Sequence, residues 1–153
     1  MEQSCEQQFG DNTIEMTNCR QLEAQTWAVL LDHELAYAVQ GAKTQDARCQ
    51  TDWKDDCKQD PVSFGHVEAT LRRSQAAWVA MADATCDYTY KINVEGSAKN
   101  PLFARCQRDL VFARQQFFWA AASFACDCNV DQHLPDLHYD GDVVPFAFRK
   151  PAK

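Results

Sequence analysis

The fold is decided by residues 66–88, which read HVEATLRRSQAAWVAMADATCDY. This stretch contains no glycine or proline, and most of its residues favour helix. Its larger side chains recur at intervals of three and four residues, the spacing that places them along one helix face. The stripe consists of Val67, Leu71, Ser74, Trp78, Met81 and Thr85, with Arg72, Arg73 and Asp83 outside it. The stretch is therefore predicted to be a long amphipathic helix with one face in a core.

Two further long helices are predicted before and after this one. The first spans about residues 12–40, where Asp11 or Asn12 can cap the helix, Glu15 lies in its first turn and Gly41 is expected to end it. The other spans about residues 100–124, where Asn100-Pro101 supplies a cap residue and a proline at the first helical position. The side chains expected to face the core are Ile14, Cys19, Leu22, Thr26, Val29, Leu30, Ala36 and Tyr37 in the first helix, and Leu102, Cys106, Leu110, Phe117 and Trp119 in the last.

The remaining segments have a different composition. Residues 43–65 alternate acidic and basic side chains, which predicts a surface excursion with a short helix at about 46–57. Residues 126–153 contain Pro135, Gly141, Pro145 and Pro151, which is typical of an irregular tail. The predicted fold is all-α: a disulfide-stapled bundle of three long helices, a short helix in an insertion and an irregular C-terminal tail. We expect one helical domain at 1–125 with the tail, 126–153, packed on it.

The chain has eight cysteines, which predicts disulfides and an oxidising compartment. In an up-down-up bundle, the start of the first helix, the end of the second and the start of the third share one pole. Cys86 is therefore expected to pair with Cys106, and Cys5 with Cys19. Cys49 and Cys57, eight residues apart, are too distant to bond within one continuous helix, so either the segment turns between them or each reaches elsewhere. Together with Cys126 and Cys128, they are expected to tie the excursion to the tail in either cross-pairing.

Charge and hydropathy limit the partners. The formal net charge of −7 argues against nucleic acid, whose phosphates attract clustered Lys and Arg, and favours a basic partner. No stretch reaches the roughly 18 apolar residues of a membrane span. No apolar leader segment follows Met1, so we expect a mature periplasmic or secreted chain from which a signal peptide has been removed.

Catalytic and metal-binding motifs are weak, and we expect no enzyme, metal or cofactor. No serine stands in a nucleophile elbow, and the cysteines have disulfide roles. A zinc site at Cys126, Cys128, His133 and His138 is an alternative, but thiols in this compartment are expected to be oxidised. Asp136, Asp140 and Asp142 flank Gly141 without the spacing of a calcium loop, so a solvated turn is favoured.

Several blocks of sequence resemble one family. Leu71-Arg72-Arg73-Ser74-Gln75-Ala76-Ala77-Trp78 followed by Asp83-Ala84-Thr85-Cys86 is similar to the leucine, arginine, glutamine, tryptophan and cysteine pattern of the lysozyme inhibitor LprI-like family. The positions of Cys5, Glu15-Met16-Thr17-Asn18-Cys19, Gly96-Ser97 and Cys106 with Arg114 also resemble that family. The chain departs from it at Ala82, where an Arg is usual, and at Ala36, where an Asn is usual. The resemblance implies a small helical domain of the bacterial envelope, with some members linked to inhibiting lysozyme.

These observations predict a protein that blocks a peptidoglycan-degrading enzyme by occlusion. The target is expected to be a lysozyme, or a toxin for which this chain is the immunity protein. The candidate contact residues are Asp52, Trp53, Asp55 and Asp56, an aromatic anchor among acids, although Trp53 packed beneath its own loop fits the pattern equally well. The alternative is a structural or ligand-binding envelope module in which Phe112, Phe117, Phe118, Trp119 and Phe124 line a pocket.

Overall fold

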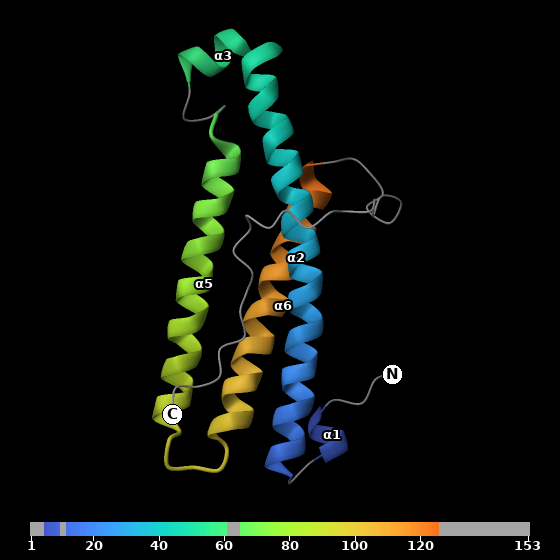
Figure 1. Ribbon diagram of the computed structural model, residues 1–153, viewed down its shortest axis with the longest axis vertical. Coiled ribbons are helices and arrows are strands. Elements are labelled where there is room, and N and C mark those ends of the chain that lie inside the picture. The colour runs from blue at the N-terminus through green and yellow to red at the C-terminus, as the bar shows by residue number, and fades with distance from the viewer. Residues whose placement is uncertain (1–4, 10–11, 61–64, 126–153) are drawn as a thin grey trace.

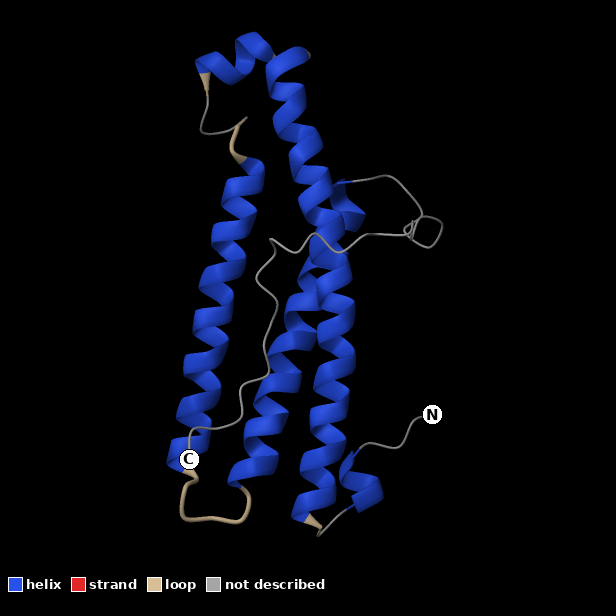
Figure 2. Ribbon diagram, viewed as in Figure 1, coloured by secondary structure: helices blue, strands red, loops and turns tan. Residues whose placement is uncertain are grey.

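The computed structural model describes residues 5–9, 12–60 and 65–125. They form helices α1 (Cys5–Phe9), α2 (Thr13–Thr51), α3 (Lys54–Gln59), α5 (Val67–Ile92) and α6 (Lys99–Ala125). Figure 2 shows helices and loops, and no strand, in this part of the chain. The all-α fold with three long helices is therefore confirmed. The expected tail, with Cys126 and Cys128, and the helix-to-tail boundary lie outside the described residues.

The three long helices run up, down and up (Figure 1). α2 leads from the pole that holds α1 to the pole that holds α3, α5 returns, and α6 runs parallel to α2. Side chains from α2, α5 and α6 form one core, in which α6 packs along most of α2. Its buried members are Ala28, Leu31, Leu35, Val39, Ala82, Val111 and Phe118.

α2 begins as expected and ends later than expected. Asn12 Oδ1 accepts hydrogen bonds from the backbone nitrogens of Ile14 and Glu15 at 3.1 and 3.2 Å, so the predicted cap is confirmed. The predicted end at Gly41 is wrong, because the helix continues to Thr51. Gly41 is exposed with open space around it, and the next residue, Ala42, is buried. The cost of one helical glycine, about 1 kcal/mol, is thus offset by the packing that follows it.

The expected short helix at 46–57 is also wrong in its bounds. Residues 46–51 are the last turns of α2, the chain bends at Asp52 and Trp53, and α3 occupies only Lys54–Gln59.

The predicted core face of α2 is wrong. Ile14, Leu22, Val29, Leu30 and Tyr37 are exposed, whereas a second set at helical spacing is buried. This buried set is Ala24, Ala28, Leu31, Leu35, Val39 and Ala42, and the expected Ala36 is buried as well, as predicted. With Ala36, the buried residues include four alanines, and small side chains allow α6 to approach α2 closely. The larger apolar side chains lie on the opposite face.

α5 and α6 match their predicted positions with shifted ends and faces. α5 runs four residues beyond the expected Tyr88, and it buries Gln75, Ala82 and Cys86 in place of the expected Ser74, Met81 and Thr85, which are exposed. In α6, Phe103, Val111 and Phe118 are buried, while the expected Phe117 and Trp119 are exposed. Of the predicted stripe residues, Leu71, Trp78 and Leu110 do pack against the core. The exposed ones lie about one position out of register with the buried residues.

Candidate partner-binding site

The four predicted contact residues lie together at the corner where α2 ends and α3 begins, which we call the tip (residues 48–60). Asp52, Asp55 and Asp56 are exposed, and Trp53 is half-buried. The guanidinium of Arg48 lies 5.6 Å from the centre of the Trp53 ring, and its Nε lies 3.8 Å from Oδ2 of Asp52. Asp55 and Asp56 stand in the first turn of α3. Trp53 therefore packs under Arg48, whose guanidinium also lies near the Asp52 carboxylate.

A disulfide holds the tip in its bent form. Cys49 on α2 and Cys57 on α3 are bonded, with their Cα atoms 5.7 Å apart. In one continuous helix, eight residues would separate them by about 12 Å, so the bond requires the bend at Asp52 and Trp53. The expected cross-pairing of these cysteines with Cys126 and Cys128 is wrong, because the bend brings Cys49 and Cys57 within reach of each other.

A pocket of about 490 Å³ lies beside this disulfide. Its lining includes two lysines on α3, a histidine at the start of α5 and one carboxylate. The lining is therefore more positively charged than the exposed aspartates of the tip. The lining residues are Asp46, Cys49, Gln50, Lys54, Cys57, Lys58, Gly65 and His66.

Asp46 fixes the start of α5 relative to α2. Its Oδ1 and Oδ2 accept hydrogen bonds from the backbone nitrogens of Val67 and Glu68, at 2.8 and 3.1 Å. His66, the residue in the cap position, has φ 62° and makes no side-chain cap bond. A carboxylate from another helix therefore supplies the cap. Sequence patterns missed this role because the two partners are 21 residues apart.

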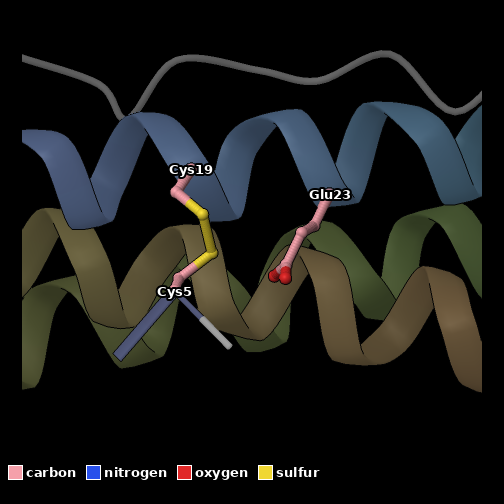
Figure 3. Close-up of side chains that lie close together, drawn as sticks. All are labelled: Cys5, Cys19 and Glu23. Carbon is pink, nitrogen blue, oxygen red and sulfur yellow. A yellow bond between two sulfur atoms is a disulfide. The ribbon is translucent and has the colours of Figure 1, made fainter. Parts of the chain in front are cut away.

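The opposite pole carries the two predicted disulfides. Cys5 is bonded to Cys19, and Cys86 to Cys106. The carboxylate of Glu23 points toward the Cys5–Cys19 bond (Figure 3), and one of its oxygens lies within 4.8 Å of both sulfurs. Because the sulfurs are bonded to each other, they are not available as thiolate ligands for a metal.

Glu23 instead joins α2 to α6. Arg108 Nη1 donates to its Oε2 at 3.1 Å, while Arg108 Nη2 donates to Asp109 at 2.7 Å. Burial alone would lower the pKa of Arg108, but the hydrogen bonds to Asp109 and Glu23 raise it above its ordinary value. Glu23 and Asp109 are thus engaged within the fold.

Three residues of the blocks that resemble the family, Gln75, Trp78 and Arg114, are in contact between α5 and α6. Nε of Arg114 donates to Oε1 of the buried Gln75 at 3.2 Å, and its guanidinium lies over the rings of Phe118 and Trp78 at 4.7 and 5.7 Å. Burial lowers the pKa of Arg114. These contacts join α5 to α6.

None of the described helices is both long enough and apolar enough to cross a bilayer. The described part of the chain has three disulfides, as expected of an extracytoplasmic protein.

Comparison with known families gives one assignment. The model of the family described as "Lysozyme inhibitor LprI" matches residues 5–117, a span from the first described cysteine into the upper half of α6. No curated protein and no solved structure is similar enough to this chain to count as a match. The matched span holds all three described disulfides and the Gln75–Arg114 link between α5 and α6. The chain belongs to the lysozyme inhibitor LprI family.

Proposed function

We propose that this protein is a periplasmic or secreted inhibitor that binds a basic peptidoglycan-degrading enzyme and occludes it without catalysis. The target is a lysozyme, or a toxin of the same activity for which this chain is the immunity protein. The observation that carries the proposal is the family match over residues 5–117, because it spans most of the described bundle.

The geometry of the tip supports the proposal. An inhibitor that occludes an enzyme needs a protruding, preorganised feature, since ordering a flexible loop costs binding free energy. The tip lies at the end of the bundle, and the Cys49–Cys57 disulfide closes its bend (Figure 1). Trp53 offers an aromatic anchor, while Asp52, Asp55 and Asp56 offer steering charge toward a basic enzyme.

The alternative, a ligand-binding envelope module, receives less support. It expects the aromatic side chains of α6 to line a pocket, but Phe118 belongs to the core and Phe112, Phe117 and Trp119 are exposed. The pocket at the tip is lined by polar and charged side chains such as Lys54 and Lys58, and none of these aromatic side chains lines it.

The test is capture followed by a lysis assay. The immobilised protein is exposed to a panel of basic peptidoglycan hydrolases, including egg-white lysozyme, at low salt and at about 0.5 M salt. Captured enzymes are then assayed for cell-wall lysis with increasing inhibitor. We expect saturable capture and a stoichiometric loss of lysis, with faster association at low salt.

The tip is tested with matched variants. Trp53→Ala and the pair Asp55→Asn with Asp56→Asn are expected to weaken capture. The pair Asp87→Asn with Glu95→Gln makes the same change in net charge at exposed positions of the other pole, and is expected to leave capture unchanged. Capture without loss of lysis would contradict inhibition. If the Asp55 and Asp56 pair and the Asp87 and Glu95 pair change capture equally, the tip does not contact the enzyme.

A further inference from the structure

The solvent face of α2 carries a row of large apolar side chains. Leu22, Val29, Leu30 and Tyr37 are 65%, 58%, 42% and 41% exposed. At about 100° per residue, all four lie within roughly 60° of the direction of His33, which is also exposed. They cover about 22 Å of the helix, on the side opposite the buried Ala28, Leu31 and Leu35. We call these four side chains the α2 strip.

The solvent-accessible Asp, Glu, Lys and Arg side chains that α2 itself contributes around the strip are all acidic. Between Thr13 and Ala42 the chain has one Lys or Arg, Arg20, which is 4% exposed and donates to the carbonyl oxygen of Pro101 at 2.9 Å. The carboxylates of that segment are Glu15, Glu23, Asp32 and Glu34. Thirty residues of the longest helix therefore present no exposed Lys or Arg of their own to solvent, and Glu23 takes its cation, Arg108, from α6.

Asp32 and Glu34 border the strip on its two sides. They precede and follow His33 by one residue, so they project about 100° to either side of it. Both are half-buried, and neither makes an ion pair with a Lys or Arg within the described ranges. Burial raises the pKa of each, and the nearby His33 offsets that only in part. Each carboxylate is poorly solvated for an anion and would be stabilised by an incoming cation.

We infer that the α2 strip, between Asp32 and Glu34, is a docking surface for the basic enzyme, which places an apolar patch on the strip and Lys or Arg side chains beside the two carboxylates. This inference rests on the proposed function. Apolar contact surrounded by opposite charge is the arrangement of a specific interface. A second copy of this chain fits poorly, because it would set Asp32 and Glu34 against an equally acidic face.

The strip lies on α2, and the tip begins in the last turn of the same helix. Tyr37 precedes Asp52 by 15 residues, about 22 Å along the axis. A globular enzyme is large enough to touch both surfaces. The strip and the tip are therefore changed in separate variants, so that the contribution of each to binding can be measured.

The test measures Kd for each member of the hydrolase panel that wild type captures, using the full chain. We expect Asp32→Lys with Glu34→Lys to raise Kd about tenfold or more, and Val29→Gln with Leu30→Gln to raise it by a similar factor. The isosteric pair Asp32→Asn with Glu34→Gln gives a smaller rise and keeps the helix intact. Matched controls are Asp87→Lys with Glu95→Lys for charge, and Met81→Gln with Tyr88→Gln for exposed apolar area. Both controls are expected to bind as wild type does.

The outcomes are distinct. If wild type captures no basic hydrolase, the proposed function fails, and this inference fails with it. If wild type inhibits an enzyme and the strip variants bind it as tightly as the controls, the inference is overturned while the proposed function stands. Circular dichroism and hydrogen exchange on each variant exclude loss of fold as the cause. In the wild-type complex, slower exchange in residues 22–37 supports the inference, and unchanged exchange there contradicts it.

Discussion

Arg114 on α6 and Gln75 on α5 are joined by a hydrogen bond of 3.2 Å from Nε to Oε1, and Gln75 is 3% exposed. Arg114 also donates to Ser74 Oγ at 3.1 Å and covers the ring of Phe118. The buried Gln75 Nε2 makes no hydrogen bond within the described part of the chain. One guanidinium thus satisfies a buried amide oxygen and packs on the core.

Arg114→Ala is expected to lower the free energy of unfolding by about 2–3 kcal/mol, because it removes the cation–π contacts and leaves the Gln75 oxygen buried without its donor. Arg114→Lys is expected to recover only part of this, since an ammonium lacks the planar fork. Urea denaturation of Arg114→Ala, Gln75→Ala and the double variant gives the coupling, expected at about 1 kcal/mol. If the effects of the two single variants on the free energy of unfolding add up to that of the double variant, the hydrogen bond contributes nothing to stability.

The Asp46 cap gives a second prediction. Asp46→Ala is expected to destabilise the protein by about 1–2 kcal/mol, since it leaves the backbone N–H groups of Val67 and Glu68 without their hydrogen-bond acceptor at the start of α5. Asp46→Asn keeps an acceptor and should cost less. Denaturation gives the energies, and hydrogen exchange should show faster opening in the first turn of α5. Faster exchange at the tip alone would mean that Asp46 does not hold α5.

Two of the disulfides are expected to differ in how much of the fold they stabilise. Replacing Cys86 and Cys106 with Ala removes a link over 20 residues between α5 and α6, at a cost of about 3 kcal/mol in global stability. Replacing Cys49 and Cys57 removes a link over 8 residues that joins only the end of α2 to α3. In that variant the tip should open locally, while the denaturation midpoint of the whole domain stays near the wild-type value. Denaturation with residue-level hydrogen exchange separates the two, and a similar global loss in both would contradict the distinction.

Much of the fold was predictable because its signals are local. The stretch 66–88 has helical spacing with no breaker, Asn12 is a cap, and the up-down-up order brings Cys86 near Cys106. The family resemblance was carried by residues that pack α5 on α6, and the match over residues 5–117 confirms it.

The errors have a shared physical cause. α2 has two apolar stripes, and periodicity alone does not say which one a neighbouring helix covers. The larger side chains were expected inside, yet the alanine-containing stripe is buried. The Cys49–Cys57 pair and the Asp46 cap depend on a bend at Asp52 and Trp53 that carries no glycine or proline. The tip contact residues are grouped by that bend, and their binding role stays a prediction.

Asp32 and Glu34 lead to a prediction about stability and its pH dependence. Because burial raises the pKa of both carboxyls above the unfolded values, the folded state favours their protonated forms. The contribution of the two carboxyls to the free energy of unfolding is therefore most favourable below their pKa in the unfolded state. It is lost as the pH rises through their pKa in the folded state. Asp32→Asn with Glu34→Gln is expected to raise the thermal midpoint at about pH 7, and this gain over wild type should shrink toward zero as the pH falls below about 4.

Paired thermal melts of wild type and this variant across that range measure the difference, which cancels the effect of acid on the other carboxylates. Asp87→Asn with Glu95→Gln, at exposed positions, is the control and should show no such trend. The same Asp32 and Glu34 variant is expected to bind the basic enzyme more weakly. A stabilised protein that binds less well would mean that the two carboxylates are kept for binding at some cost in stability. A variant that is less stable than wild type at neutral pH would show instead that these carboxylates support the fold.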